Sequence, residues 1–190
     1  MLDALIADEV TLTETGVAAR CDKLVYRVEC AQRDAERLAG GEATVLTEVE
    51  MSDDTVVLVG FSSEERRRLY RALRAVSGIG RRSALLVLDC GEVIDTLRAV
   101  AAKDTSYFRG VPGLGKARID AVITQLAKRY RGALPNPLPL PVCVWVEARD
   151  ALAHTHDLRA AERHLRDALE RSDRAPGDAA ELLALVASGR

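Results

Sequence analysis

The sequence lacks any hydrophobic run long enough to cross a membrane, and no basic N-terminus precedes an apolar segment. A membrane-spanning helix needs roughly 18 or more apolar residues, so we expect a soluble, cytoplasmic protein with no membrane partner. The sequence also lacks a C-x-x-C pair among its four cysteines, which are Cys21, Cys30, Cys90 and Cys143. Scattered cysteines are typical of buried free thiols in a reducing compartment, so we expect no disulfide.

The sequence has few residues that could form an active site or bind a metal ion. Its three histidines, His154, His156 and His164, lie near the C-terminus, and no cysteine or carboxylate cluster completes a metal-binding set there. No Ser/His/Asp or Cys/His arrangement is apparent, and no pair of carboxylates has a spacing that specifies hydrolysis. We therefore expect a binding protein with no catalytic residue, metal ion or cofactor of its own.

Charge is distributed unevenly along the chain, although the net charge is only −2. Residues 1–63 carry a net charge of −8, residues 64–132 carry +8 and residues 133–190 carry −2. A basic segment between two acidic ones favours a nucleic-acid partner for the middle of the chain. The alternative is that arginine-rich helices simply aid solubility.

One short pattern occurs twice in the basic segment, thirty-five positions apart. The copies begin at Leu73 and Phe108 and share five identities in sixteen aligned residues. Each copy predicts a helix, a tight Gly-hydrophobic-Gly turn and a second helix that begins with cationic residues. Backbone N–H groups, the positive end of a helix dipole and side-chain charge then meet at one place, which suits a phosphate. Two such places predict a protein that holds a nucleic-acid backbone without reading bases.

These turns allow two other interpretations. Glycine commonly ends a helix, so a single copy would be explained as a C-terminal cap, but two copies with identical spacing favour phosphate binding. The second copy also contains Gly110–Lys116, which fits G-x-x-x-x-G-K and resembles a nucleotide-binding P-loop. Ala117 lacks the hydroxyl that would bind Mg²⁺, the segment before Gly110 is expected to be helical rather than a strand, and no Walker B acid is evident. We therefore interpret the P-loop match as a coincidence.

The N-terminal third has the alternation of short β-strands. Alternating or β-branched runs cover residues 24–30, 44–51 and 55–61, and the breaks between them contain glycine, serine and aspartate. About five strands in roughly sixty residues predict a small closed barrel of the oligonucleotide-binding (OB) type. Residues 32–38 could instead form a short helix.

The rest of the chain is expected to be helical. Ser62 or Ser63 can cap a first helix that ends before Gly78, and further helices are expected over residues 81–88, 92–102 and 116–130. Four prolines between residues 133 and 141 indicate an extended linker. Beyond the linker, residues 144–153, 158–170 and 179–187 predict a small three-helix domain, with Trp145 as a packing anchor.

Asp53 and Asp54 lie between two predicted strands, at the expected tip of a hairpin. Aspartate is common in turns, so an ordinary turn is the simpler interpretation. The functional interpretation is a pair of exposed negative charges that repel phosphates and help to force strands apart.

This order of domains resembles the RuvA family, which recognises Holliday junctions within the bacterial RuvAB branch-migration machinery. The likeness extends over nearly the whole chain and is strongest over residues 53–132, where the acidic pair, the Gly60-Phe61 dipeptide and both hairpin motifs stand in family register. The barrel is more divergent, with Val25 and Asp3 where the family usually has glycine. In the tail, residues 154–157 replace the family's Leu-Gly-Tyr-like turn.

The resemblance implies an α+β multidomain fold. Its parts would be an N-terminal OB-fold β-barrel (1–62), a central all-α tandem helix-hairpin-helix domain (63–132), a Pro-rich linker (133–143) and a C-terminal small three-helix domain (144–190). Positions matching the family's DNA contacts, together with the adjacent cations, are Gly78, Ile79, Gly80, Arg81, Arg82, Gly113, Leu114, Gly115, Lys116 and Arg118. Ala117 stands where the family often has lysine, and Arg118 is expected to compensate.

The resemblance also implies partners. Four copies would form a flat homotetramer, or two such rings an octamer, that holds a square-planar four-way junction, with Asp53 and Asp54 as central acidic pins. The three-helix tail would contact RuvB, the AAA+ ATPase that drives branch migration, and a RuvC-type resolvase is a further partner that the resemblance allows. The chain would be the non-catalytic subunit of an ATP-dependent helicase in recombination and repair. The alternatives are another helix-hairpin-helix repair module that binds duplex or nicked DNA, and a P-loop enzyme that uses Lys116.

Overall fold

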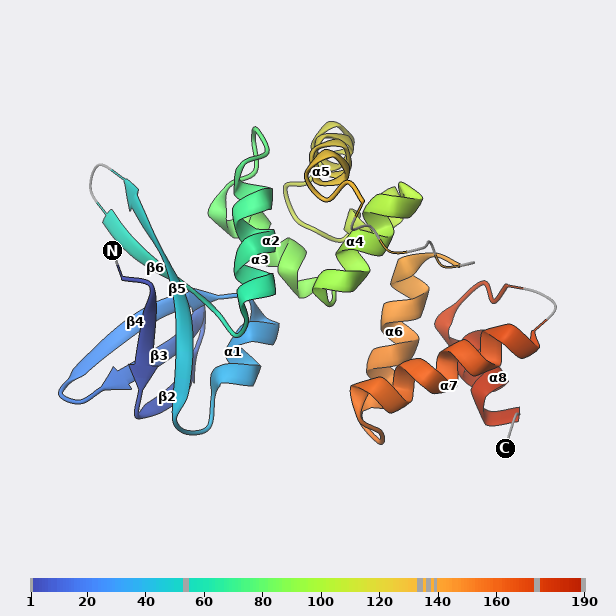
Figure 1. The fold of residues 1–190 in the computed structure, drawn as a ribbon, viewed down its shortest axis with the longest axis horizontal. Helices are drawn as coiled ribbons and strands as arrows, with labels where there is room; N and C mark the ends of the chain where they lie inside the picture. Colours follow the sequence, from blue (N-terminus) through green and yellow to red (C-terminus); the bar gives the residue numbers. More distant parts are fainter. Residues whose placement is uncertain are drawn as a thin grey trace.

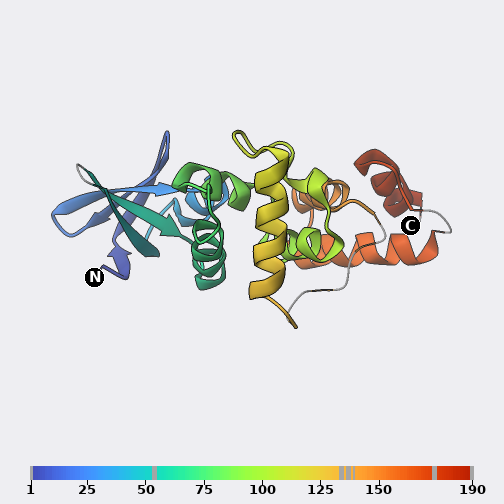
Figure 2. The same cartoon turned by 90° about the horizontal axis from the view of Figure 1, so that it is seen from above.

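The computed structural model describes residues 2–52, 55–132, 135, 138, 140–172 and 175–188. It has a β-barrel at one end, a group of helices in the middle and three further helices at the other end (Figure 1). Seen from above, helix α5 crosses the middle of the molecule, between the barrel side and the tail side (Figure 2). The predicted fold class is confirmed.

The barrel contains six strands rather than about five. These are β1 (Ala4–Ala7), β2 (Glu9–Thr13), β3 (Gly16–Cys21), β4 (Leu24–Cys30), β5 (Ala43–Ser52) and β6 (Thr55–Phe61). Their order in the sheet is β1-β5-β6-β4-β3-β2; the pair β4/β6 is parallel and the other described pairs are antiparallel. The sheet closes on itself because Val10 of β2 exchanges two backbone hydrogen bonds of 3.1 Å with Gly40 and Gly41, just before β5.

Alternating apolar residues fill the barrel, as the sequence predicts. Val10, Val17, Ala19, Val28 and Val45 are all almost fully buried in one cluster. The short helix α1 (Gln32–Leu38) covers one end of the barrel with Ala35 and Leu38, so the helical alternative for this segment is confirmed. A two-residue period thus places one face of each strand in the core.

The central helices are α2 (Glu64–Arg74), α3 (Arg81–Asp89), α4 (Val93–Ala102) and α5 (Lys116–Arg129). The Ser63 hydroxyl accepts a hydrogen bond of 3.3 Å from the Arg66 N–H and caps α2. Before Gly110 the chain forms only a four-residue 3-10 helix, η1 (Thr105–Phe108). This 3-10 helix, which is capped by Asp104, is shorter than the helix that the sequence predicts there.

The tail consists of α6 (Val142–Ala153), α7 (Leu158–Arg171) and α8 (Ala179–Ser188). Helix α6 begins two residues earlier than expected, inside the segment assigned to the linker. Trp145 is fully buried, and the guanidinium groups of Arg98 and Arg166 lie 5.4 and 5.6 Å from its ring. None of the described helices is long and apolar enough to cross a membrane.

The tail packs against the central helices through buried charge. Arg149 of α6 pairs with Asp95 of α4, and both side chains are fully buried. The N–H of Val142 donates to Oδ2 of Asp104 at 2.9 Å, and Arg33 of α1 pairs with Asp150. These contacts join three parts of the chain that the sequence indicates as separate domains.

The four cysteines are free thiols, but the expectation that they are buried is wrong for Cys143, which is exposed. Burial, reinforced by the charge of Asp34, raises the pKa of Cys30 to about 12. Burial and the charge of Asp89 likewise raise the pKa of Cys90 to about 11. Both thiols are therefore protonated at neutral pH, which makes them poor nucleophiles and poor metal ligands.

Candidate nucleic-acid interface

The two Gly-hydrophobic-Gly turns have the same backbone conformation. Gly78 and Gly113, the first glycine of each turn, have φ angles of +81° and +79°. This left-handed region is open to glycine but strains other residues, which explains glycine at both positions. In each turn, the N–H of the hydrophobic residue (Ile79 or Leu114) donates to the carbonyl three residues earlier, at 3.1 Å in both cases. The sequence repeat is therefore also a structural repeat.

The second glycine of each turn begins a helix. Gly80 and Gly115 are the N-cap residues of α3 and α5, and neither helix has a side-chain hydrogen bond at its cap. The first N–H groups of a helix have no partner within it, and the helix dipole is positive there. A Cβ placed on Gly80 or Gly115 would meet no atom within 4 Å, so a ligand can approach the backbone closely. Both turns thus have the features of a phosphate site.

The hydrophobic residues of the turns point inward. Ile79 is 3% exposed and Leu114 is 6% exposed, and both belong to the main core cluster. Their side chains anchor the turns, so these two predicted contact residues can offer only main-chain groups to a ligand.

Arg118 brings the two turns together. Its Nη1 donates to the carbonyl oxygen of Gly113 at 2.8 Å, and its Nε lies 3.4 Å from the position that a Cβ on Gly78 would occupy. One exposed guanidinium group therefore braces the second turn while lying against the first. The two candidate phosphate sites form one surface.

The cations that open the two second helices differ in their surroundings. Arg82 and Lys116 are exposed, as expected for residues that contact DNA. Arg81 instead donates from Nε to Glu29 at 2.7 Å, and its Nη1 lies 3.5 Å from Glu50. Arg81 is thus directed toward the barrel.

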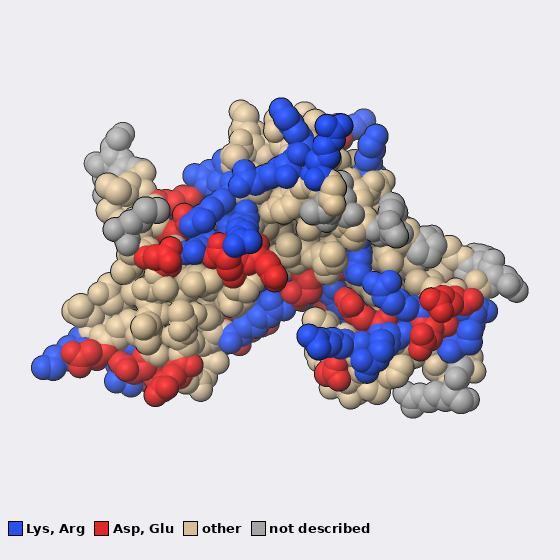
Figure 3. Space-filling model, in the orientation of Figure 1, with Lys and Arg blue, Asp and Glu red and all other residues tan. Residues whose placement is uncertain are grey.

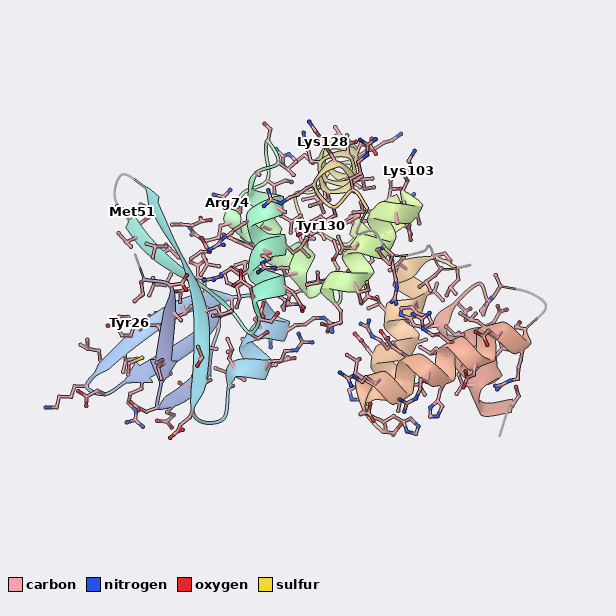
Figure 4. All side chains as sticks on the ribbon, viewed as in Figure 1. Tyr26, Met51, Arg74, Lys103, Lys128 and Tyr130 are labelled. Atoms are coloured by element: carbon pink, nitrogen blue, oxygen red, sulfur yellow. The ribbon has the colours of Figure 1, made fainter. Side chains whose placement is uncertain are left out.

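The residues that support the first turn are not among those predicted from the sequence. Nη1 of Arg74, in the last turn of α2, donates to the carbonyl oxygen of Ile79 at 2.7 Å. Glu50 accepts hydrogen bonds from Arg74 and Tyr70. A signal was available, because Glu48 and Glu50 share one face of β5 and Arg71 and Arg74 share one face of α2. Figure 4 shows Arg74 on the side of α2 toward the hairpin formed by β5 and β6.

The environment of Glu50 favours its ionised form. Partial burial opposes ionisation, but the hydrogen bonds from Arg74 and Tyr70 and the charges of Arg74 and Arg81 outweigh it, so the pKa of Glu50 is lower than usual. Burial and the bond to Glu50 together raise the pKa of Tyr70, which stays protonated as a donor.

Surface charge follows the division seen in the sequence. Lys and Arg gather over α2 and α5 at the top of the view in Figure 3, and acidic side chains border the lower edge of the barrel. Lys103 and Lys128 point outward at this upper side in Figure 4. The predicted basic middle segment therefore forms a basic surface.

The acidic pair Asp53 and Asp54 lies outside the described residues. The strands that flank it end at Ser52 and begin at Thr55, and these two residues are register partners in the β5/β6 hairpin.

The structure does not support the alternative of a nucleotide-binding P-loop. A P-loop connects a strand to a helix, whereas the short helix η1 precedes Gly110 here. Within the described ranges, no group of three or more His, Cys, Asp or Glu residues is placed to hold a metal ion. The rings of His156, in the loop before α7, and of His164, on α7, lie 4.9 Å apart.

Comparison with known proteins gives consistent matches. Residues 70–128 match the family model described as a SAM-like helix-hairpin-helix tandem, which covers both turns. The chain is 31% identical to the "Holliday junction branch migration complex subunit RuvA" of Rubrobacter xylanophilus, over 88% of this chain and 89% of that protein. The proteins of the same name from Parvibaculum lavamentivorans and Rhodopseudomonas palustris are 30% and 29% identical, over 86% and 100% of this chain and 85% and 94% of theirs. On these similarities and the repeated hairpin geometry, the chain belongs to the RuvA family.

Proposed function

We propose that this protein binds four-way DNA junctions as the non-catalytic subunit of a branch-migration complex. The observation that carries the proposal is the pair of matching turns, each of which presents uncapped helix N–H groups beside exposed cations. Such sites hold phosphates whatever the base sequence, as a junction-binding protein requires. The names of the relatives refer to a Holliday junction and to a branch-migration complex, and these names support the choice of DNA and of complex in this proposal.

In this proposal the DNA contacts are the main chain of residues 78–80 and 113–115, with Arg82, Lys116 and Arg118 as the cations. Asp53 and Asp54 serve as acidic pins at the crossover, where their charges repel the phosphates of entering strands. At separations near 10 Å such repulsion is only partly screened at physiological salt.

Assembly into a homotetramer would place the four basic surfaces around one junction. Met51 and Val56, register partners on the β5/β6 hairpin, are 78% and 66% exposed. Apolar side chains exposed to this extent on a projecting hairpin suit burial against another copy of the chain. A second tetramer on the opposite face of the junction would give an octamer.

The energy-consuming step belongs to a partner in this proposal. The three-helix tail is the docking site for the RuvB ATPase, and a RuvC-type resolvase would act on the same junction. A complex of this kind works on chromosomal DNA, so we place it in the bacterial cytoplasm, in recombination and repair.

The deciding experiment titrates the purified chain against a four-way junction and a linear duplex of equal length, over a range of salt concentrations. We expect a clear preference for the junction that persists as salt rises, and a complex whose mass equals four or eight chains per junction. Equal affinities for the two DNAs at every salt concentration would instead point to a general helix-hairpin-helix duplex-binding module.

A further inference from the structure

A chain of polar contacts passes from the barrel to the first hairpin turn through Glu50. Its Oε1 accepts a hydrogen bond from the Tyr70 hydroxyl at 2.5 Å and another from Nε of Arg74 at 2.7 Å. Its Oε2 lies 3.5 Å from Nη1 of Arg81. One carboxylate therefore contacts both arginines that flank the turn.

Each of these arginines has a second partner that fixes its direction. Arg74 donates to the carbonyl oxygen of Ile79, inside the turn, at 2.7 Å. Arg81 donates to Glu29 of β4 at 2.7 Å. The side chains of Glu50, Arg74 and Arg81 are 20%, 36% and 33% exposed, so water only partly weakens the attraction between their charges.

The second turn is arranged differently. Lys116 follows Gly115 as Arg81 follows Gly80, but Lys116 is exposed and forms no ion pair within the part of the chain that the structure describes. Among the described residues, an acidic restraint of this kind is therefore confined to the first turn.

We propose that Glu50 is a positioning residue that holds Arg74 and Arg81 back from DNA. This inference rests on the proposed function. The first turn then meets a phosphate through its main-chain N–H groups and Arg82. Glu50 thereby favours the arrangement of DNA strands that fits the turn over other arrangements.

The reason lies in the different geometric demands of the two kinds of contact. A long arginine side chain can follow a phosphate over several ångströms, and such contacts supply most non-specific DNA binding. Main-chain N–H groups at a helix start have fixed directions and accept a phosphate in only one place. Restraining the mobile cations therefore lowers affinity for any duplex more than it lowers affinity for the DNA that fits.

The test measures the binding of the full-length Glu50→Ala variant to a linear duplex and to a four-way junction, as a function of salt. Without Glu50, Arg81 keeps only Glu29 as a carboxylate partner, so it should add up to one phosphate contact and the slope of log K against log salt should steepen by up to about 1. Duplex affinity should rise several-fold, and the preference for the junction should shrink. A residue with a purely structural role would give the opposite result, because its loss would weaken binding to both DNAs.

Three further variants serve as controls. Glu48→Ala removes the neighbouring carboxylate on the same face of β5, whose partner Arg71 does not touch the turn, and it should leave the slope unchanged. Adding Arg81→Ala to Glu50→Ala should cancel the steeper slope. Glu50→Gln keeps an oxygen acceptor for Tyr70 and Arg74, so it should fold normally and change the slope in the same direction, by less.

The results separate this inference from the proposed function. Suppose that the wild-type protein prefers junctions but the salt slope of Glu50→Gln is no steeper than that of wild type. This result would overturn the inference and leave the proposed function standing. A wild-type protein without junction preference would overturn the proposed function, and a steeper duplex slope in Glu50→Ala would still support restraint of the arginines. A wild-type protein that binds neither DNA would overturn both.

Discussion

The glycines of the two turns have separate tasks that substitution can distinguish. Gly78 and Gly113 have positive φ angles, whereas Gly80 and Gly115 have φ angles of −84° and −72°, which any residue can adopt. The first pair is therefore required by the fold of the turn. The second pair is required only if something approaches the backbone closely.

We predict that Gly115→Val leaves the fold nearly intact and weakens DNA binding. The new side chain has open space in the free protein, so the free energy of unfolding should fall by less than about 1 kcal/mol. It would obstruct a phosphate at the helix start, so junction affinity should fall by at least about tenfold, or roughly 1.4 kcal/mol. Urea unfolding and junction titration measure the two effects.

The matched variant is Gly113→Ala in the same turn. Its Cβ also meets no atom within 4 Å, but the residue must stay in the left-handed region, which costs about 1–2 kcal/mol. Stability should therefore fall more than in Gly115→Val. Equal junction affinity in wild type and Gly115→Val would contradict a backbone contact at this turn.

For Arg118, the structure shows a larger role than the sequence predicts. The sequence indicates only a cation that compensates for Ala117, whereas the structure shows a guanidinium group that lies between both turns. No pattern in one sequence could show this contact, because it depends on how α2 and α5 pack.

We predict that Arg118→Ala reduces the slope of log K against log salt by about 1, since one phosphate contact is lost. Arg118→Lys should restore the slope but not the full affinity, because lysine lacks the planar fork that reaches both turns. Arg159→Ala, in an exposed part of α7, removes the same charge far from the turns and serves as the control. A slope unchanged by Arg118→Ala would remove this residue from the DNA contacts.

At the scale of elements, the sequence predicts most of what the structure contains. Alternation indicates the strands, and glycine and serine mark the ends of the helices, because these signals are local. The contacts of Glu50 with Tyr70 and Arg74 are not local, since they join β5 to a helix twenty or more residues later. For this reason the candidate phosphate sites could be found from sequence, whereas the shared faces of β5 and α2 indicate only a set of charged residues and not which of them pair at the turn.

Helix α4 begins at a carboxylate that also joins it to the barrel. The N–H of Glu92 donates to Oδ2 of Asp95 at 2.8 Å, and the Glu92 side chain pairs with Arg37 of α1. Burial opposes ionisation of Glu92, but the hydrogen bond and charge of Arg37, with the charges of Arg66 and Arg149, hold its pKa below the usual 4.5.

This lowered pKa gives a pH prediction for Glu92→Gln. A carboxylate whose pKa is lower in the folded state stabilises the fold above its unfolded pKa, and the effect is lost as the pH falls through the folded pKa. The free energy of unfolding of wild type should therefore exceed that of the variant by about 1 kcal/mol at pH 7, and the difference should shrink as the pH falls below 4.5 and be lost below the lowered pKa of Glu92. Glu65→Gln, on exposed α2 surface, is the control, and a pH-independent difference would refute the assignment.

At the scale of the whole molecule, the tail and the central helices form one core. A continuous cluster of buried apolar residues includes Phe61 of β6, Leu88 of α3, Trp145 of α6 and Leu182 of α8. The proline-rich segment predicts a tail separated from the rest, but that signal describes the connection and cannot report a surface that forms only in the folded chain. The domain boundaries drawn from the sequence therefore remain a prediction. The buried apolar cluster extends across them.

We predict that Arg149→Ala costs about 3 kcal/mol of unfolding free energy, because it leaves the buried Asp95 carboxylate with Arg98 as its remaining charged partner. Arg163→Ala, exposed on α7, should cost less than about 0.5 kcal/mol. Adding Asp95→Leu to Arg149→Met should recover much of the loss, since a buried ion pair can be replaced by apolar packing. A small effect of Arg149→Ala in urea unfolding would mean that the tail does not depend on this pair.

The pairing of Arg149 with Asp95 also has a mechanical consequence. A force applied to the tail by a partner would reach the central helices through Asp95, and the barrel through the contact between Arg33 and Asp150. It would not have to stretch the proline-rich segment first. Pulling on the tail would therefore displace the two candidate phosphate-binding turns directly, and the load that breaks this joint should fall as added salt screens its more exposed contact at Arg33.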